Sequence, residues 1–194
     1  MKRFVLVLFL TSLLLSGYAQ TDSSLQVRLD SFFHLNHLKE IDRVLDYTYP
    51  KLFTIVPREQ MHEVMKSTFD NDEMTVTMDS LKLVKTYPML NTEEGSFVQM
   101  EYTMIMRMQF KQTDSTDNPE QMATITSLLS LKYGEGNARY DSIQKQIVIL
   151  VKSPLLAIRD RISPQWTFIN FKKDDMITPM LLSKDILDKL SSKQ

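Results

Sequence analysis

Apolar residues recur every three or four positions through the first part of the chain, which is the period of an α-helix. Six positions carry this stripe: Leu25, Leu29, Leu38, Ile41, Leu45 and Leu52. The pattern predicts helix from about 25 to 55, kinked or split at Pro50, because proline removes an internal hydrogen bond. A second helix is predicted from Pro57, since proline suits the first helical position. Its stripe is Met61, Val64, Met65 and Phe69.

The period then changes to the alternation of a β-strand. Apolar and polar residues alternate over 74–79, whereas the next apolar residues, Leu81 and Leu83, are out of phase by one position. A slip of one residue turns the buried face of a strand outward. We therefore predict a β-bulge near Asp79 and Ser80, which restores the phase with one extra residue.

The clearest strand in the sequence is 97–111. Seven apolar residues share one of its faces: Val98, Met100, Tyr102, Met104, Met106, Met108 and Phe110. Polar residues occupy the other face, with Ile105 as the exception. At about 3.4 Å per residue, so long a strand must twist or bend.

The second half of the chain alternates between helix and strand. Asn118 and Pro119 cap and open a third helix, which Gly134 ends, and Ser183 caps a closing helix. Strand is predicted over 137–141 and 146–152, which form a hairpin, and over 155–161 and 166–171. This order predicts an α+β class, with N-terminal helices packed on a curved antiparallel β-sheet in one domain.

Residues 1–19 differ from everything that follows. A positive start at Lys2 precedes an apolar run, and small residues then favour a cut between Ala19 and Gln20. This order predicts a secretory signal peptide, followed by one domain over 20–194. The apolar run is shorter than the roughly 20 residues that cross a membrane, and no cysteine follows it, so we predict no stable membrane anchor. The protein is expected in a periplasm or outside the cell.

Composition excludes several classes of function. The formal net charge of −1 becomes more negative once the leader is removed, which argues against nucleic acid and anionic membranes as partners. Absence of cysteine removes disulfides, thiolate catalysis and cysteine-based zinc sites. Glycine occurs only 4 times, and no phosphate-binding glycine motif is present. We predict no cofactor.

Two groups of residues raise the question of a metal. His34, His37 and Glu40 have helical spacing, but the spacing of the zinc proteases is absent and His34 falls on the predicted buried stripe. We interpret His34 as a histidine at the core edge and His37 as exposed. The methionines of 97–111 are thioethers, which suit Cu(I), but their alternate positions are those of core side chains. No metal site is predicted.

The order of elements, with Trp166-Thr167-Phe168-Ile169 in the last strand, resembles the nuclear transport factor 2-like, or cystatin-like, cone fold. Within that group it is similar to small exported Bacteroidetes proteins that lack an assigned function. The resemblance implies a sheet that curls around the helices and leaves a cone-shaped cavity. Enzymes of this fold resemble ketosteroid isomerase, in which an apolar pocket holds a carboxylate base and a hydrogen-bond donor. The acids in predicted elements are Asp42, Asp46, Asp79 and Glu101, and for each a solvated surface role is favoured.

These observations predict an exported, non-catalytic protein that binds a small apolar ligand or a protein partner in a cavity between sheet and helices. The expected lining is Tyr102, Met104, Met106 and Trp166; no catalytic residue is assigned. One alternative is an isomerase- or dehydratase-like enzyme on the same fold, marked by a buried acid with a raised pKa. Another is an interaction module that forms a homodimer through the opposite strand face: Gln99, Glu101, Thr103, Ile105 and Arg107.

Overall fold

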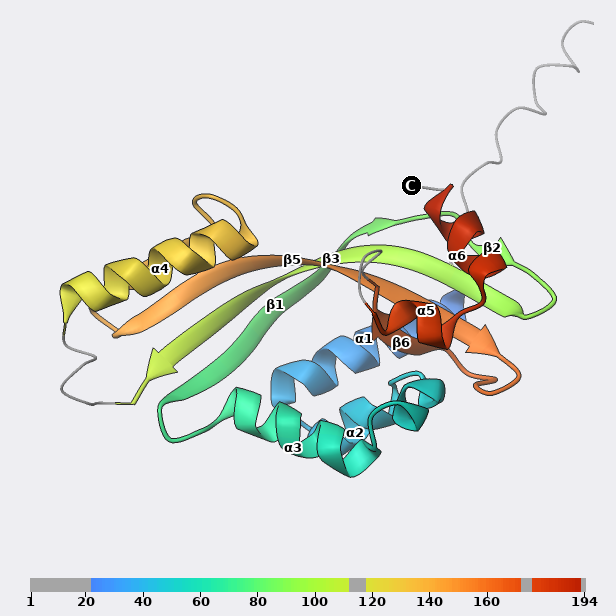
Figure 1. Cartoon of the computed structure of the whole chain (residues 1–194), viewed down its shortest axis with the longest axis horizontal. Helices are drawn as coiled ribbons and strands as arrows, with labels where there is room; N and C mark the ends of the chain where they lie inside the picture. The colour runs from blue at the N-terminus through green and yellow to red at the C-terminus, as the bar shows by residue number, and fades with distance from the viewer. Residues whose placement is uncertain (1–21, 112–117, 172–175, 193–194) are drawn as a thin grey trace, which may run out of the picture.

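Six β-strands pair antiparallel in the computed structural model, which describes residues 22–111, 118–171 and 176–192 (Figure 1). The strands are β1 (Met74–Thr86), β2 (Leu90–Asn91), β3 (Gly95–Phe110), β4 (Ala138–Asp141), β5 (Gln146–Asp160) and β6 (Thr167–Asn170). The helices are α1 (Ser23–Leu38), α2 (Ile41–Asp46), the 3-10 helix η1 (Pro50–Thr54), α3 (Arg58–Phe69), α4 (Pro119–Tyr133), α5 (Thr178–Leu181) and α6 (Lys184–Ser191). The strand order is β1-β3-β5-β4, with β2 paired to β3 and β6 to β5. The predicted α+β class, with N-terminal helices on an antiparallel sheet, is confirmed.

The front of the chain folds into shorter helices than the predicted one over 25–55. α1 ends at Lys39, which takes the left-handed conformation with φ 57°, and Pro50 opens the separate helix η1. The predicted apolar stripe also differs from the buried one. Leu38 is 48% exposed, because it is the last residue of α1 beside the turn, whereas Phe33 and Leu35 are buried.

The β-bulge predicted near Asp79 is confirmed. β1 and β3 pair without interruption as far as Asp79 opposite Ile105, and pairing resumes at Lys82 opposite Thr103. Ser80 has φ 54°, so the chain makes a local left-handed bend there. The extra residue returns Leu83 to the sheet face that Tyr102 shares, and the apolar side of β1 therefore stays on one face.

β5 is a single strand, where the sequence predicted two segments with a break after residue 152. Pro154 lies between the two predicted segments, and proline has no N–H to donate to a neighbouring strand. In the structure Pro154 lies between two partners of β5: β4 pairs as far as Ile149 and β6 begins at Leu155. No strand in the described ranges pairs with Pro154 on that edge, so the strand continues through it.

One face of the long strand β3 packs against two sets of helices. Val98, Met100 and Tyr102 pack with α1 in one half of the strand. Met104, Met106, Met108 and Phe110 pack with α4 in the other half. Figure 1 shows the strong twist of the sheet, whose two ends lie next to different helices. α4 begins after Asn118, whose side chain accepts two backbone N–H groups, and it ends at Gly134, as predicted.

The opposite face of the sheet is covered at one end by the C-terminal helices. Phe97, Leu156 and Ile158 form a core there with residues of α5 and α6, including Leu181 and Ile186. The cap that Ser183 was predicted to supply to α6 is present, since its hydroxyl accepts the N–H of Ile186. Within the described ranges, no helix is both long enough and apolar enough to cross a bilayer.

Candidate ligand-binding cavity

An apolar cavity of about 500 Å³ lies between the sheet and the front helices. Its walls come from α1, α2 and α3 on one side and from β1, β3 and β5 on the other, and they continue to β6 and α5. Figure 1 shows these helices lying along the sheet. Protein cavities that bind small molecules have volumes of roughly 300–1,000 Å³. The size therefore suits a small organic molecule.

The sheet wall of the cavity is built from the apolar face of β1 and β3. Met78 and Met106 are cross-strand partners, so their side chains lie beside each other on this face. Met104 and Tyr102 follow along β3 at two-residue intervals and point the same way. The alternation that the sequence shows over β1 and β3 turns these four side chains, Met78 on β1 and the other three on β3, toward the helices.

The helical wall is supplied mainly by α1 and α3. Met61 and Met65 are one turn apart on α3 and both line the cavity, as do Phe32 and Asn36 on α1. Phe69 closes the C-terminal end of α3 and is its one buried residue among the described side chains. One side of α3 therefore lines the cavity, and the rest of the helix is largely exposed.

No charged side chain lines the described part of the cavity. Its polar groups are amides and hydroxyls: Asn36, Thr48, Thr68, Asn170, Thr178 and Tyr102. A neutral, mostly apolar wall with a few hydrogen-bonding groups favours uncharged ligand surface, because burial of an unpaired charge is costly.

Tyr102 contributes a hydroxyl from the sheet wall. It is 8% exposed, and burial raises the pKa of its phenol, while hydrogen bonding to Ser153, its cross-strand partner, opposes that rise. The phenol is therefore protonated at neutral pH and is available as a neutral donor or acceptor.

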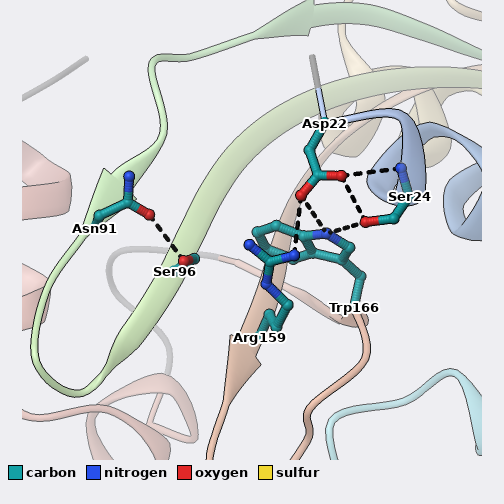
Figure 2. Close-up of polar contacts among 6 residues, drawn as sticks. All are labelled: Asp22, Ser24, Asn91, Ser96, Arg159 and Trp166. Carbon is teal, nitrogen blue, oxygen red and sulfur yellow. Dashed lines mark hydrogen bonds and ion pairs between the residues drawn. The ribbon is translucent and has the colours of Figure 1, made fainter. Parts of the chain in front are cut away.

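The structure brings together three of the four residues predicted as lining. Tyr102, Met104 and Met106 are on the cavity wall, whereas Trp166 lies elsewhere, beside the start of α1. Figure 2 shows the indole of Trp166 with its partners. Its Nε1 donates to Ser24 Oγ at 3.2 Å and to Asp22 at 3.4 Å. Trp166, 1% exposed, thus anchors the segment before β6 to the front helix.

The sequence did not assign the rest of the lining to a site. The sequence places Met61 and Met65 on a helical stripe and Met78 on the apolar face of a strand, positions that are equally those of core residues. The signal that points to a cavity is the gathering of methionine on three separate apolar faces. Whether three such faces meet around a space depends on how the elements pack, which the sequence pattern does not encode.

The histidines are not arranged as the helical stripe predicted. His34 is exposed on α1 and is not at the core edge, because the buried stripe runs through Phe33 and Leu35. His37 is exposed as predicted, and its Nδ1 lies 3.0 Å from the carbonyl oxygen of Met78. Within the described ranges, no group of three or more histidine or acidic residues is placed to hold a metal ion.

The acids considered for catalysis lie outside the cavity lining and have other partners. Asp46 pairs with Arg58 at 2.8 Å, and Asp79 pairs with Arg107 at 3.0 Å. Glu101 is held by Lys152 and by the Tyr87 hydroxyl, and these two hydrogen bonds lower the pKa of its carboxyl. Asp42 is exposed, with His62 3.8 Å away.

The strand face opposite the cavity is partly exposed beyond the end that α5 and α6 cover. Glu101, Thr103, Ile105 and Arg107 are half-buried there. Gln99, by contrast, is 4% exposed, and its side-chain amide has no hydrogen-bond partner among the described residues. Arg107 pairs with Asp79 and Lys152 with Glu101 on this face, and between these two pairs lie the apolar Ile105 and the 42% exposed Leu150.

Comparisons with known proteins leave the family open. No protein-family model matches this chain, and neither does any curated protein or solved structure with which it was compared.

Proposed function

We propose that this protein is an exported, non-catalytic binding protein that takes up a small apolar molecule in the cavity between its sheet and its front helices. The observation that carries this proposal is a neutral cavity of about 500 Å³ whose walls are mostly methionine, leucine and aromatic side chains. Its volume and its few polar groups are those of small-molecule sites in proteins.

Export is part of the proposal and rests on the sequence of residues 1–19, which lie outside the described residues. The finer resemblance to the nuclear transport factor 2-like cone fold is likewise proposed here. It is supported by the order of helices and strands and by a cavity on the helical side of the sheet.

The residues that line the cavity favour a binding function over an isomerase- or dehydratase-like enzyme. Such an enzyme needs a carboxylate base facing the ligand together with a hydrogen-bond donor. The described lining offers Tyr102 as a donor but no carboxylate. Glu101 lies on the opposite face of β3 with a lowered pKa, which is the wrong direction for a buried general base or acid.

A titration of the methionine methyl groups tests the proposal at the site itself. The protein, with methyl-labelled methionine, is titrated by NMR with dodecanol and, separately, with the rigid steroid progesterone. We expect at least one probe to shift the methyl signals of the lining methionines: Met61, Met65, Met78, Met104 and Met106.

Met122 is the internal control for this titration. It is 2% exposed in α4 and does not line the cavity, so its methyl signal should stay in place. The proposal fails if neither probe moves the lining methyl groups, or if Met122 responds as strongly as they do.

A further inference from the structure

We propose that the ligand is a long-chain fatty acid, with its alkyl chain in the cavity and its carboxylate at Lys39 on the rim. This inference rests on the proposed function and names the ligand class of the same site. Three observations carry it: the kind of side chain on the walls, the absence of charge along the described lining, and the surroundings of Lys39.

Methionine supplies five of the lining residues and comes from both walls. Its unbranched, polarisable side chain has several rotatable bonds and adapts to irregular apolar shapes. Walls of this kind fit a flexible alkyl chain that takes many conformations. They do not preform a flat slot, which a rigid polycyclic ligand would need. The cavity runs from Phe69 at the end of α3 to Leu181 in α5, which leaves room for an extended chain.

The neutral lining decides where a charged head group can lie. A carboxylate inside the described cavity would have no cationic partner, and burial of an unpaired carboxylate costs several kcal/mol. The head group of a fatty acid must therefore stay at the rim, where water and a basic side chain stabilise it.

Lys39 is placed to supply the basic side chain that stabilises the carboxylate at the rim. It caps α1, and its Nζ lies 5.9 Å from the ring centroid of Phe69, which lines the cavity. Lys39 takes part in none of the ion pairs among the described residues. The nearby Asp70 is already held by Lys111 at 2.9 Å and by the Thr75 hydroxyl at 2.9 Å.

A second lysine near the cavity is already engaged. Lys51 approaches the other end of the lining, but its Nζ donates to the carbonyl oxygen of Leu181 at 2.6 Å. A carboxylate bound there would have to displace this hydrogen bond. Lys39 makes no such hydrogen bond among the described residues. Lys111 and Thr75 hold the exposed Asp70 carboxyl directly and lower its pKa, and the charge of Lys39 helps to lower that pKa further.

Calorimetric titration of the purified, delipidated protein tests the inference with three probes: hexadecanoate, hexadecanol and progesterone. We expect hexadecanoate to bind more tightly than hexadecanol, and progesterone to bind at least tenfold more weakly than either. Across a series of shorter fatty acids, affinity should rise by about fourfold for each added methylene until the cavity is filled.

The head-group contact is tested by Lys39→Asn, which removes the charge and keeps a residue that tolerates the left-handed conformation. This variant should weaken hexadecanoate by about three- to fivefold and leave hexadecanol unchanged, as expected for a partly exposed ion pair. The matched control is Lys132→Asn. Lys132 also places its Nζ near an aromatic ring, 5.2 Å from the centroid of Tyr133, but that ring, unlike Phe69, does not line the cavity.

The outcomes separate this inference from the proposed function. If progesterone binds and neither alkyl probe does, the fatty-acid inference is wrong while the binding function stands. If the acid and the alcohol bind equally and Lys39→Asn changes neither, the assignment of the head group is wrong. If no probe binds the unaltered protein, both the inference and the proposed function fail.

Discussion

At the scale of single residues, Asp22 holds three parts of the chain together. Its carboxylate accepts the N–H of Ser24 at the start of α1, pairs with Arg159 of β5 at 3.0 Å, and accepts the indole N–H of Trp166 (Figure 2). Arg159 also lies 4.6 Å from the centroid of the Trp166 ring system. The start of α1 is therefore tied to the sheet by one carboxylate.

Replacement of Asp22 by alanine should lower the free energy of unfolding at neutral pH by about 1–2 kcal/mol, because a helix cap and two further contacts are lost. The hydrogen bond from the Ser24 hydroxyl, followed by the other donors, lowers the pKa of Asp22 below its ordinary 3.8. The unfolded chain thus binds a proton more readily than the folded protein. The stabilising effect is present above about pH 4 and is lost as the pH falls through the folded pKa.

Urea denaturation of Asp22→Ala and of the unaltered protein at pH 6 and pH 3 measures this effect. The difference between the two proteins should shrink at pH 3. The exposed Asp72 serves as the control, since Asp72→Ala should change little at either pH. A difference that stays constant with pH would show that the Asp22 carboxylate contributes no linked protonation.

Gly95 is a second position at which the structure restricts the residue type, in this case to glycine. It has φ 153°, and a Cβ added there would lie 2.6 Å from the carbonyl oxygen of Arg159 on β5. Gly136 has φ 77° but nothing within 4 Å of an added Cβ. Gly95→Ala should therefore cost about 2–3 kcal/mol and Gly136→Ala about 1 kcal/mol. Equal losses in chemical denaturation would contradict the close approach of β3 and β5.

At the scale of elements, α3 buries the fewest residues of the α-helices that line the cavity. Phe69 is its one buried residue among the described side chains, whereas α1 buries Leu25, Leu29, Phe33 and Leu35. Few buried contacts lower the free energy needed for local opening. α3 is thus the element through which a ligand would most readily enter.

Hydrogen exchange measures this expectation. Amides of α3 should exchange faster than those in the middle of α1, and a bound apolar probe should slow the exchange of α3 because Met61 and Met65 then gain contacts. Amides of α6, which does not line the cavity, should not respond. Equal protection of α1 and α3 would contradict the proposed entry route.

Elements with strong local signals were predicted well from the sequence. The alternation over β3, the bulge near Asp79 and the cap of α4 each depend on a few neighbouring residues, and all three are present. The predicted helix over 25–55 was too long, because the turn at Lys39 uses a non-glycine residue in a left-handed conformation and carries no sequence signal.

The continuity of β5 and the position of Trp166 could not be predicted from neighbouring residues in the sequence. Pro154 is tolerated because β4 ends before it and β6 begins after it, which is a property of the whole sheet. Trp166 has the pattern of a core aromatic residue in either place, and the partners that hold it, Asp22 and Ser24, are more than a hundred positions away in the chain. Tyr102, Met104 and Met106 all line the cavity because they lie on one face of β3; their role in binding stays a prediction.

At the scale of the whole molecule, two sets of helices pack on different halves of one face of the twisted sheet. One half of β3 packs against α4, and the other packs against α1 beside the cavity. Met104 belongs to both regions, since it packs with the α1 cluster and the α4 cluster and lines the cavity. A change at Met104 therefore reports on the cavity more directly than a change in the closed core.

The most direct test of the central claim is native mass spectrometry of the protein produced in its own host from the full sequence, residues 1–19 included. Three forms are compared: the unaltered protein, Met104→Trp, which fills the cavity, and Leu131→Trp, which adds the same bulk at an 84% exposed position of α4. The account predicts an extra mass, lost on denaturation, in the unaltered protein and in Leu131→Trp but not in Met104→Trp. An unaltered protein without that mass, or a folded Met104→Trp that keeps it, would contradict a ligand in this cavity.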